Sequence, residues 1–213
     1  MSLEAALSRD RLSRYRRWTR GDEVLSLELY ALNVAVSEAF YTSLHILEIT
    51  LCNAVHNRLT EAHGRRWFSQ EDVITDRYQR QKVRDAVAKS GLESSDGKVI
   101  AELTFGFWTA LFGRTNAVLW GQDLRKIFAP EVPLRRKHIA RRLNDIRNLR
   151  NRIAHHEPII QLDLRTAHAE ARELIGWISA ETLDWCDERC RFRQMHPGHQ
   201  IIVGNLMNPD LKL

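Results

Sequence analysis

The stretch RNLRNRIAHHEPI, from Arg147 to Ile159, gathers side chains that can act on a phosphodiester. It holds three arginines within six residues, followed by two adjacent histidines, a glutamate and a proline. Histidine titrates near neutral pH and serves as base or acid, and the planar fork of arginine fits phosphate oxygens. Cleavage of RNA by its own 2′-hydroxyl needs a base, an acid and charge stabilisation, but no metal. These residue types favour metal-independent RNA cleavage over the simpler interpretation, a solvated basic helix end.

Arg150 interrupts an apolar stripe on the helix expected over Leu134–Ala154. The members of this stripe are Ile139, Leu143, Ile146 and Ile153. A guanidinium in an apolar seam is costly unless it is paired or faces a polar cleft. It can therefore serve at a site, lie at the edge of the core, or pair with a buried acid such as Glu48.

The helix is expected to end near His155–Glu157, because Pro158 disfavours helical geometry at the residue before it. At about 100° per residue, His155 points ~40° away from Asn151 and ~140° away from Arg150. These three side chains converge only if the helix end unwinds or if a second copy of the helix faces the first. The geometry favours a site at a dimer cleft, in which Asn151 orients the arginine or the histidine.

Basic residues are concentrated in two segments of a chain whose formal net charge is only +5. Six arginines lie in Arg9–Arg20 with one acid, Asp10, and eight lysines and arginines lie in Leu134–Arg152 with one acid, Asp145. Concentrated positive charge favours a polyanion partner such as RNA, although two solvated faces would give the same pattern. The residues predicted to bind RNA are Arg14, Arg16, Arg17, Arg141 and Arg142.

Other chemistries fit the sequence less well. Adjacent histidines on a helix point ~100° apart and no H-E-x-x-H motif occurs, so His155 and His156 do not predict a zinc site. His196 and His199 lie in a segment rich in proline and glycine and are expected to be solvated. Cys52 lies on an apolar helix, where its thiol should be inert with a raised pKa. We predict no metal and no cofactor.

The composition favours helices around a sizeable core. Hydrophobic residues make up 44% of the 213-residue chain, and glycine and proline are sparse, at ten and five. We predict one all-α domain of about five to six helices, with a spine over 24–59 and further helices over 76–89, 99–113, 134–154 and 166–192. A loop is expected over 90–98 and a short strand at 201–203. The expected organisation is a basic N-terminal arm (1–21), a helical domain (22–193) and an irregular tail (194–213).

No apolar N-terminal segment and no run of about 18 apolar residues occurs, so we expect a cytoplasmic protein without a membrane partner. Three cysteines form no disulfide framework, in agreement with a reducing compartment. The tryptophans are expected in the core, with Trp18 in the arm as the candidate for base stacking.

The motif RNRIAHHEPI resembles the C-terminal motif of the Abi-like (abortive infection, AbiD/AbiF-type) proteins, a branch of the HEPN superfamily. The blocks VSEAFYTSLHILEITLCNAVHNRL, GRRWF and ELTFGFWTALF resemble that family's other blocks in the same order, over roughly residues 8–185. One departure occurs in the spine block, which in the family often carries an arginine where this chain has Cys52, between Glu48 and Asn53. Glu48 is then free to pair with Arg150, which would position or quench that arginine.

The resemblance implies an all-α HEPN-like bundle, a homodimer with facing R-x4-H motifs, and metal-independent endoribonuclease activity in antiviral defence or as a toxin. An antitoxin or a phage-encoded trigger would then be a partner. By motif position, Arg150, Asn151 and His155 match the catalytic residues. The supporting residues are Glu48, Asn53, Arg147, His156 and Glu157. The alternative is a non-catalytic RNA-binding or phage-sensing module of the same fold.

Overall fold

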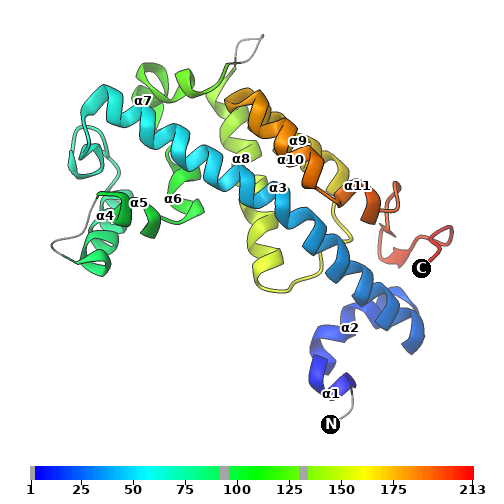
Figure 1. The fold of residues 1–213 in the computed structure, drawn as a ribbon. Helices are drawn as coiled ribbons and strands as arrows, with labels where there is room; N and C mark the ends of the chain where they lie inside the picture. Colours follow the sequence, from blue (N-terminus) through cyan, green and yellow to red (C-terminus); the bar gives the residue numbers. More distant parts are fainter. Residues whose placement is uncertain (1–2, 92–95, 130–133) are drawn as a thin grey trace.

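The computed structural model describes residues 3–91, 96–129 and 134–213. It is an all-α bundle built along one long helix, α3 (Glu23–His63), which runs across the whole molecule (Figure 1). The other α-helices are α1 (Leu3–Leu7), α2 (Arg9–Trp18), α4 (Arg77–Ser90), α5 (Asp96–Glu102), α6 (Phe105–Ala110), α7 (Ala117–Gln122), α8 (Arg136–Ala154), α9 (Leu164–Ile178), α10 (Ala180–Arg189) and α11 (Phe192–Met195). Short 3-10 helices are η1 (Trp67–Ser69), η2 (Arg114–Asn116) and η3 (Leu124–Ile127). The predicted all-α fold with a long N-terminal spine is confirmed.

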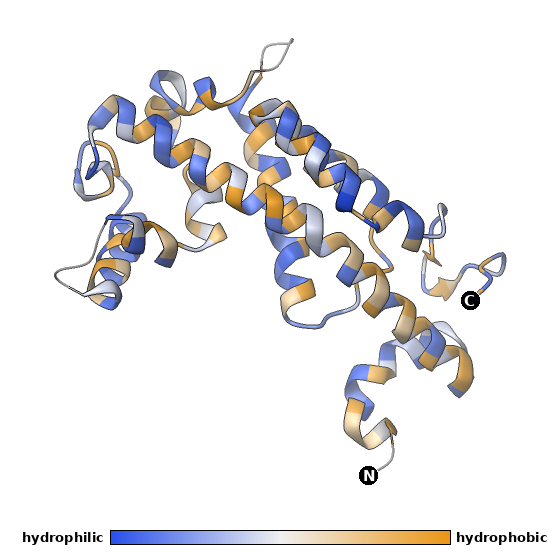
Figure 2. Ribbon diagram, viewed as in Figure 1, coloured by the Kyte–Doolittle hydropathy of each residue, from blue (hydrophilic) through white to orange (hydrophobic). Residues whose placement is uncertain are grey.

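The spine helix α3 is bounded by local signals in the sequence. Asp22 caps its first turn by accepting a hydrogen bond from the backbone N–H of Leu25 at 3.0 Å. Gly64 ends the helix with a φ of 85°, a conformation that suits glycine. Between these ends, buried apolar side chains form one face, seven residues apart at its start and then three or four apart: Leu29, Val36, Phe40, Leu44, Leu47, Leu51, Val55 and Leu59. Figure 2 shows apolar residues along the full length of this helix.

Two helices predicted as continuous are interrupted, which is why the bundle has more and shorter helices than expected. The segment 99–113 breaks between α5 and α6, where Thr104 is extended and the carbonyl of Leu103 accepts a hydrogen bond from Trp108 Nε1 at 3.0 Å. The segment 166–192 breaks between α9 and α10 at Ser179, whose hydroxyl accepts from the backbone N–H of Thr182 at 3.1 Å. A side-chain cap at Ser179 and a local side-chain-to-backbone hydrogen bond at Leu103 therefore outweigh helical continuity at these two positions.

Loop and strand predictions were partly correct. Residues 92–95 of the predicted loop lie outside the described part of the chain, and its last three residues, 96–98, already belong to α5. The predicted strand is present as β1 (Ile202–Val203), which pairs antiparallel with β2 (Leu206–Met207). This hairpin lies near the C-terminus (Figure 1).

The basic N-terminal segment and the C-terminal tail pack together on the first half of α3. Tyr15 and Trp18 of α2 are buried with Leu29 of α3 in a second apolar cluster. The tail and the loop after α8 complete that cluster with Ile160, Ile201, Ile202 and Leu211. Trp18 is therefore a core residue, and its side chain is not available for base stacking.

Within the described ranges, no helix combines the length and the apolar character needed to cross a membrane.

A buried carboxylate joins the far end of α3 to the segment that precedes η3. Asp123, whose side chain is 5% exposed, accepts hydrogen bonds from Arg58 Nη2 at 2.7 Å and from His63 Nε2 at 2.9 Å. Burial alone would raise the pKa of Asp123, but the hydrogen bonds from His63 and Arg58 outweigh it and hold that pKa below its usual range. The ionised carboxylate is thus the form that the folded chain stabilises.

Asp123→Asn is expected to lower the free energy of unfolding at pH 7 by about 1.5–3 kcal/mol, because it removes the carboxylate that accepts hydrogen bonds from Arg58 and His63. A carboxyl group whose pKa is lowered by folding stabilises the folded chain at pH values above its unfolded-state pKa of about 3.9. This stabilisation is lost as the pH falls through the folded-state pKa. The difference in the free energy of unfolding between wild type and Asp123→Asn should therefore become smaller below about pH 4. Urea denaturation at several pH values measures both effects. Asp85→Asn, at an exposed position on α4, is the matched control; equal stability of wild type and Asp123→Asn at pH 7 would contradict the prediction.

Candidate active site

The helix α8 stays regular up to Ala154 and then stops in a defined turn. His155 is the first residue beyond the helix, and its backbone N–H still donates to the Asn151 carbonyl at 2.9 Å. The N–H of His156 donates to Ile153 at 3.0 Å and that of Glu157 to Arg152 at 2.8 Å, the hydrogen-bond pattern of a Schellman motif. The prediction that the helix ends near these histidines is confirmed.

His156 occupies the position of this motif that glycine usually takes. Its φ is 57°, in the left-handed region that costs a side chain roughly 1–2 kcal/mol. The neighbouring ion pair between Arg152 Nη2 and Glu157 Oε2, at 3.5 Å, spans the same turn. His156 and Glu157 therefore shape the helix end, and His155 next to them is exposed.

Asn33 fixes the chain that follows this turn. Its side-chain oxygen accepts a hydrogen bond from the backbone N–H of Ile159 at 2.8 Å, and Asn33 itself is only 4% exposed. The carbonyl of Pro158 accepts from Arg152 Nη2 at 3.1 Å and from Gln161 Nε2 at 2.9 Å. The sequence analysis missed Asn33, although a buried amide within the apolar face of the spine was a readable signal.

Arg150 pairs with Glu48 of the spine, as the missing arginine at position 52 suggested. Arg150 Nη2 lies 3.4 Å from Glu48 Oε2, and the two side chains are 36% and 27% exposed. The contact is a single, partly solvated ion pair, so it leaves the guanidinium accessible. Leu149, rather than Arg150, completes the fully buried stripe of α8.

His155 lines a cavity of about 440 Å³ between the start of α2 and the end of α8. The residues around it are Ser8, Asp10, Arg11, Ser13, Arg14, His155, His156, Glu157 and Pro158. Two arginines and two histidines thus face one space together with two carboxylates. The structure brings His155 to Arg14, and it adds Arg11, which the sequence analysis did not name.

The orientation of α2 explains why Arg11 and Arg14 lie at this cavity. Leu12, Tyr15 and Trp18 recur every three residues and are buried against the rest of the chain, which turns the opposite side of α2 outward. Arg11 and Arg14 flank the buried face, ~40° and ~100° from its centre on an ideal helix, and are both exposed. The burial of three apolar side chains therefore positions two cations beside the helix end.

Arg150 does not line the cavity that His155 lines. Because α8 does not unwind before His155, these two side chains keep the angular separation of an ideal helix, ~140°. Asn151, between them in sequence, is exposed. Within one copy of the described chain, the three predicted catalytic residues therefore share a helix end but not a pocket.

Arg141 and Arg142 are engaged in packing between α8 and α9. Arg141 binds Glu170 at 2.9 Å, and Arg142 Nη1 binds Glu173 at 2.5 Å while its guanidinium lies 5.1 Å from the ring centre of Trp177. Their charges are largely neutralised by acids of the neighbouring helix. The prediction that they bind RNA has no support in this arrangement and remains a prediction.

The other predicted residues are dispersed. Arg16 lies 3.6 Å from Glu23, and Arg17 is exposed on α2. Arg147 binds Asn144 at 2.5 Å, on α8 but outside the residues that line the cavity of His155. Asn53 is exposed on α3, ~140° around the helix from Glu48.

The pKa of the thiol at position 52 is raised, as predicted. Burial, and secondarily the carboxylate of Glu48, raise the pKa of Cys52 to about 11. No group of three or more histidine, cysteine, aspartate or glutamate side chains suited to a metal ion occurs among the described residues.

An exposed strip of α3 runs past the pair of Glu48 and Arg150. It carries Tyr41, 54% exposed, and Ile49, 44% exposed, with His45 stacked on Tyr41 at a ring separation of 5.9 Å. On an ideal helix, Tyr41 and His45 lie within ~60° of Glu48, so they share its side of the spine. The sequence analysis named none of these three residues.

Comparisons with models of known protein families, with curated proteins and with solved structures find no match for this chain. The resemblance to Abi-like proteins remains a prediction that rests on the quoted sequence blocks.

Proposed function

We propose that this chain is a metal-independent endoribonuclease that cleaves RNA by attack of its own 2′-hydroxyl. The observation that carries the proposal is the placement of His155, which a defined turn holds outward, in one cavity with Arg11 and Arg14. Histidine supplies proton transfer near neutral pH, and two exposed guanidinium groups suit the phosphates on either side of a scissile bond.

The proposed reaction assigns one role to each residue. His155 takes the proton of the 2′-hydroxyl while that oxygen attacks phosphorus, and the bond to the 5′-oxygen breaks. The products are a 2′,3′-cyclic phosphate and a 5′-hydroxyl end, whose proton comes from a second imidazole. Arg150 donates hydrogen bonds to the non-bridging oxygens, where negative charge develops, and Asn151 orients Arg150.

The proposed active form is a homodimer in which α8 of one copy faces α8 of the other. The wide angle between Arg150 and His155 supports this, because a facing copy brings an arginine and a second imidazole to each site. Tyr41, on the same side of α3 as Glu48, and Ile49, ~100° around the helix from Glu48, expose apolar surface suited to contact such a copy.

The proposed biological setting is abortive infection or toxin-type defence in the cytoplasm. This setting rests on the sequence resemblance, as does the proposed control by an antitoxin or a phage-encoded trigger. The test of the function is cleavage of an RNA pool in EDTA by the wild type and by His155→Ala.

The second candidate is a non-catalytic RNA-binding or phage-sensing module. The ion pair of Arg150 with Glu48 favours it, since an arginine already matched by a carboxylate can be purely structural. Both candidates require RNA or a phage component as partner, but only the first requires His155 for a covalent step.

The double variant Arg11→Gln/Arg14→Gln is expected to bind RNA more weakly. The slope of log affinity against log salt concentration should become shallower by about 1.4, because each phosphate contact to single-stranded RNA contributes roughly 0.7. These exposed positions can be changed without touching the buried side of α2, whereas deletion of residues 1–20 would remove Tyr15 and Trp18 from the apolar cluster. Filter binding at several salt concentrations measures the slope. Arg84→Gln, on the exposed side of α4, is the control, and an unchanged slope in the double variant would contradict the cavity's role.

A further inference from the structure

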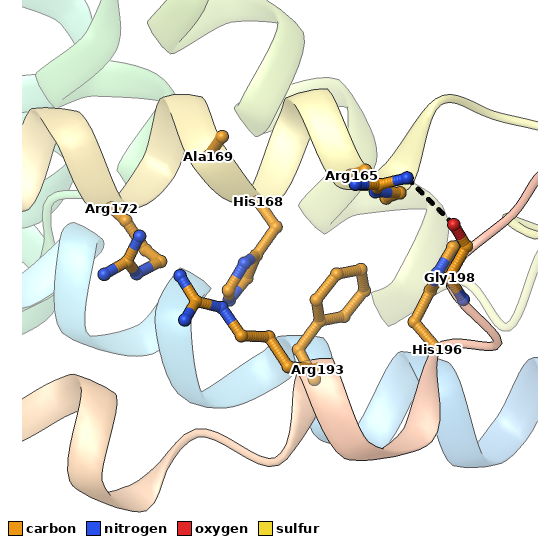
Figure 3. A pocket seen from close by; sticks show the side chains of 8 residues that line it. Arg165, His168, Ala169, Arg172, Arg193, His196 and Gly198 are labelled. Carbon is orange, nitrogen blue, oxygen red and sulfur yellow. Dashed lines mark hydrogen bonds between the residues drawn. The ribbon is translucent and has the colours of Figure 1, made fainter.

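A second basic cavity lies in the C-terminal part of the chain, between α9, α11 and the start of the tail. Its volume is about 350 Å³, within the range of roughly 300–1,000 Å³ typical of small-molecule sites. The lining residues are Arg165, His168, Ala169, Arg172, Phe192, Arg193, His196 and Gly198 (Figure 3). No residue of this cavity also lines the cavity of His155.

Positive charge lies at both ends of this cavity. In Figure 3, the guanidinium groups of Arg172 and Arg193 lie near one another beside His168 at one end. Arg165 lies at the other end, where its Nη1 donates to the carbonyl of Gly198 at 2.8 Å. The cavity is therefore positive at two separated points.

The apolar part of the wall lies between these two ends. The ring of Phe192 stacks on His168 at 4.3 Å on one side and lies 5.1 Å from the ring of His196 on the other. Phe192 and His168 are nearly fully buried, so this wall is rigid and held by the core. A rigid wall fixes the spacing of the charged ends.

Two of the three arginines form no direct ion pair, although the charge of Arg165 lowers the pKa of Asp163 and that of Arg193 lowers the pKa of Asp187. Arg172 forms a two-point ion pair with Asp187, in which Nε lies 2.6 Å from Oδ1. Within the described residues, neither Arg165 nor Arg193 has an acidic side chain within ion-pair distance. The N–H donors of both guanidinium groups that face the cavity are thus not taken up by a carboxylate, and their planar fork suits phosphate oxygens.

The histidines add no charge that would compete with these arginines. Burial, and then the charges of Arg172 and Arg193, lower the pKa of His168 to about 4. Burial, and then Arg165, lower the pKa of His196 as well. Both imidazoles are thus neutral at pH 7 and add no positive charge to the cavity.

We infer that this cavity binds a small molecule carrying two phosphoryl groups, one held by Arg165 and the other by Arg193 beside Arg172. The inference is independent of the proposed RNA cleavage, because the two cavities have separate walls. A ligand with two phosphoryl groups would join α9, α11 and the tail, and the tail also packs on α2 beside the candidate active site.

Isothermal titration of the full chain with adenosine 3′,5′-bisphosphate tests the inference, with AMP, adenosine and inorganic phosphate as further probes. We expect the bisphosphate to bind at least about tenfold more tightly than AMP, and adenosine not to bind, since each charge-assisted contact is worth about ten- to a hundredfold. Arg193→Gln should lower the bisphosphate affinity to that of AMP, and Arg193→Lys should restore part of it.

Arg193 is the right position to change because it is exposed and makes no hydrogen bond or ion pair among the described residues, so its loss should not unfold the chain. Arg189→Gln, whose side chain stacks on Trp185 at 4.3 Å outside the cavity, is the matched control. No bisphosphate binding by the wild type would overturn the inference. The inference would also be overturned if the wild type bound the bisphosphate and AMP equally well, or if Arg193→Gln kept the wild-type affinity for the bisphosphate. Binding of a 5′-phosphorylated RNA oligonucleotide alone would overturn it too.

Discussion

His155→Ala is expected to lower the rate of RNA cleavage by about 10²–10⁴-fold, because general base catalysis contributes about that much. RNA affinity should stay unchanged, because the proposed phosphate contacts are made by arginines. His155 is exposed at the end of α8, so its replacement removes no core packing. Single-turnover cleavage of a labelled RNA, beside filter binding of the same RNA, separates the two effects.

His156→Gly is the matched control for this variant. The φ of 57° at position 156 suits glycine, so the change keeps the Schellman turn and the position of His155 while removing the adjacent imidazole. We expect this control to cleave at nearly the wild-type rate. If His155→Ala cleaved as fast as the wild type, or if only His156→Gly lost cleavage, His155 would not be the base.

Arg150→Ala is expected to slow cleavage by about 10²–10³-fold, the usual effect of removing one donor that stabilises a developing oxyanion. Arg150→Lys should remain impaired, because a lysine cannot reproduce the two-point fork. Rates with saturating RNA measure the effect on the chemical step rather than on binding. Wild-type rates in both variants would leave Arg150 with a structural role alone.

Glu48→Gln shows whether the spine carboxylate positions or quenches Arg150. The pair has one contact at 3.4 Å, and Arg150 is 36% exposed, so solvent screening limits it to about 0–1 kcal/mol. Such a pair cannot hold the guanidinium against an RNA phosphate, and we expect a rate close to that of the wild type. A loss as large as that of Arg150→Ala would mean that Glu48 is required to position the arginine.

The bundle was predictable from the sequence where local patterns determine it. The apolar steps of α3, its cap at Asp22 and its end at Gly64 are all readable in sequence. The breaks at Thr104 and Ser179 were missed, because each depends on a hydrogen bond or a cap that competes with an otherwise helical pattern. The sequence also predicted the end of α8 from Pro158, but it gave no sign of the left-handed backbone at His156.

The candidate site was predictable only in part, because contacts between distant segments set most of its geometry. The pairing of Arg150 with Glu48 followed from one departure in a sequence block. The ion pairs of Arg141 and Arg142 involve acids on α9, about thirty positions later in the chain, which charge counting within one segment cannot detect. Arg11 became a site residue only once the buried side of α2 fixed which of its arginines face α8.

The most direct measurement of the central proposal is the chemistry of the RNA ends left by the purified protein in EDTA. The proposal predicts 2′,3′-cyclic phosphate and 5′-hydroxyl ends from the wild type, and none above background from His155→Ala. Ends with 3′-hydroxyl and 5′-phosphate groups, or cleavage that requires added Mg²⁺, would contradict the mechanism. RNA binding without any cleavage, whether or not His155 is present, would contradict catalysis and favour the non-catalytic module.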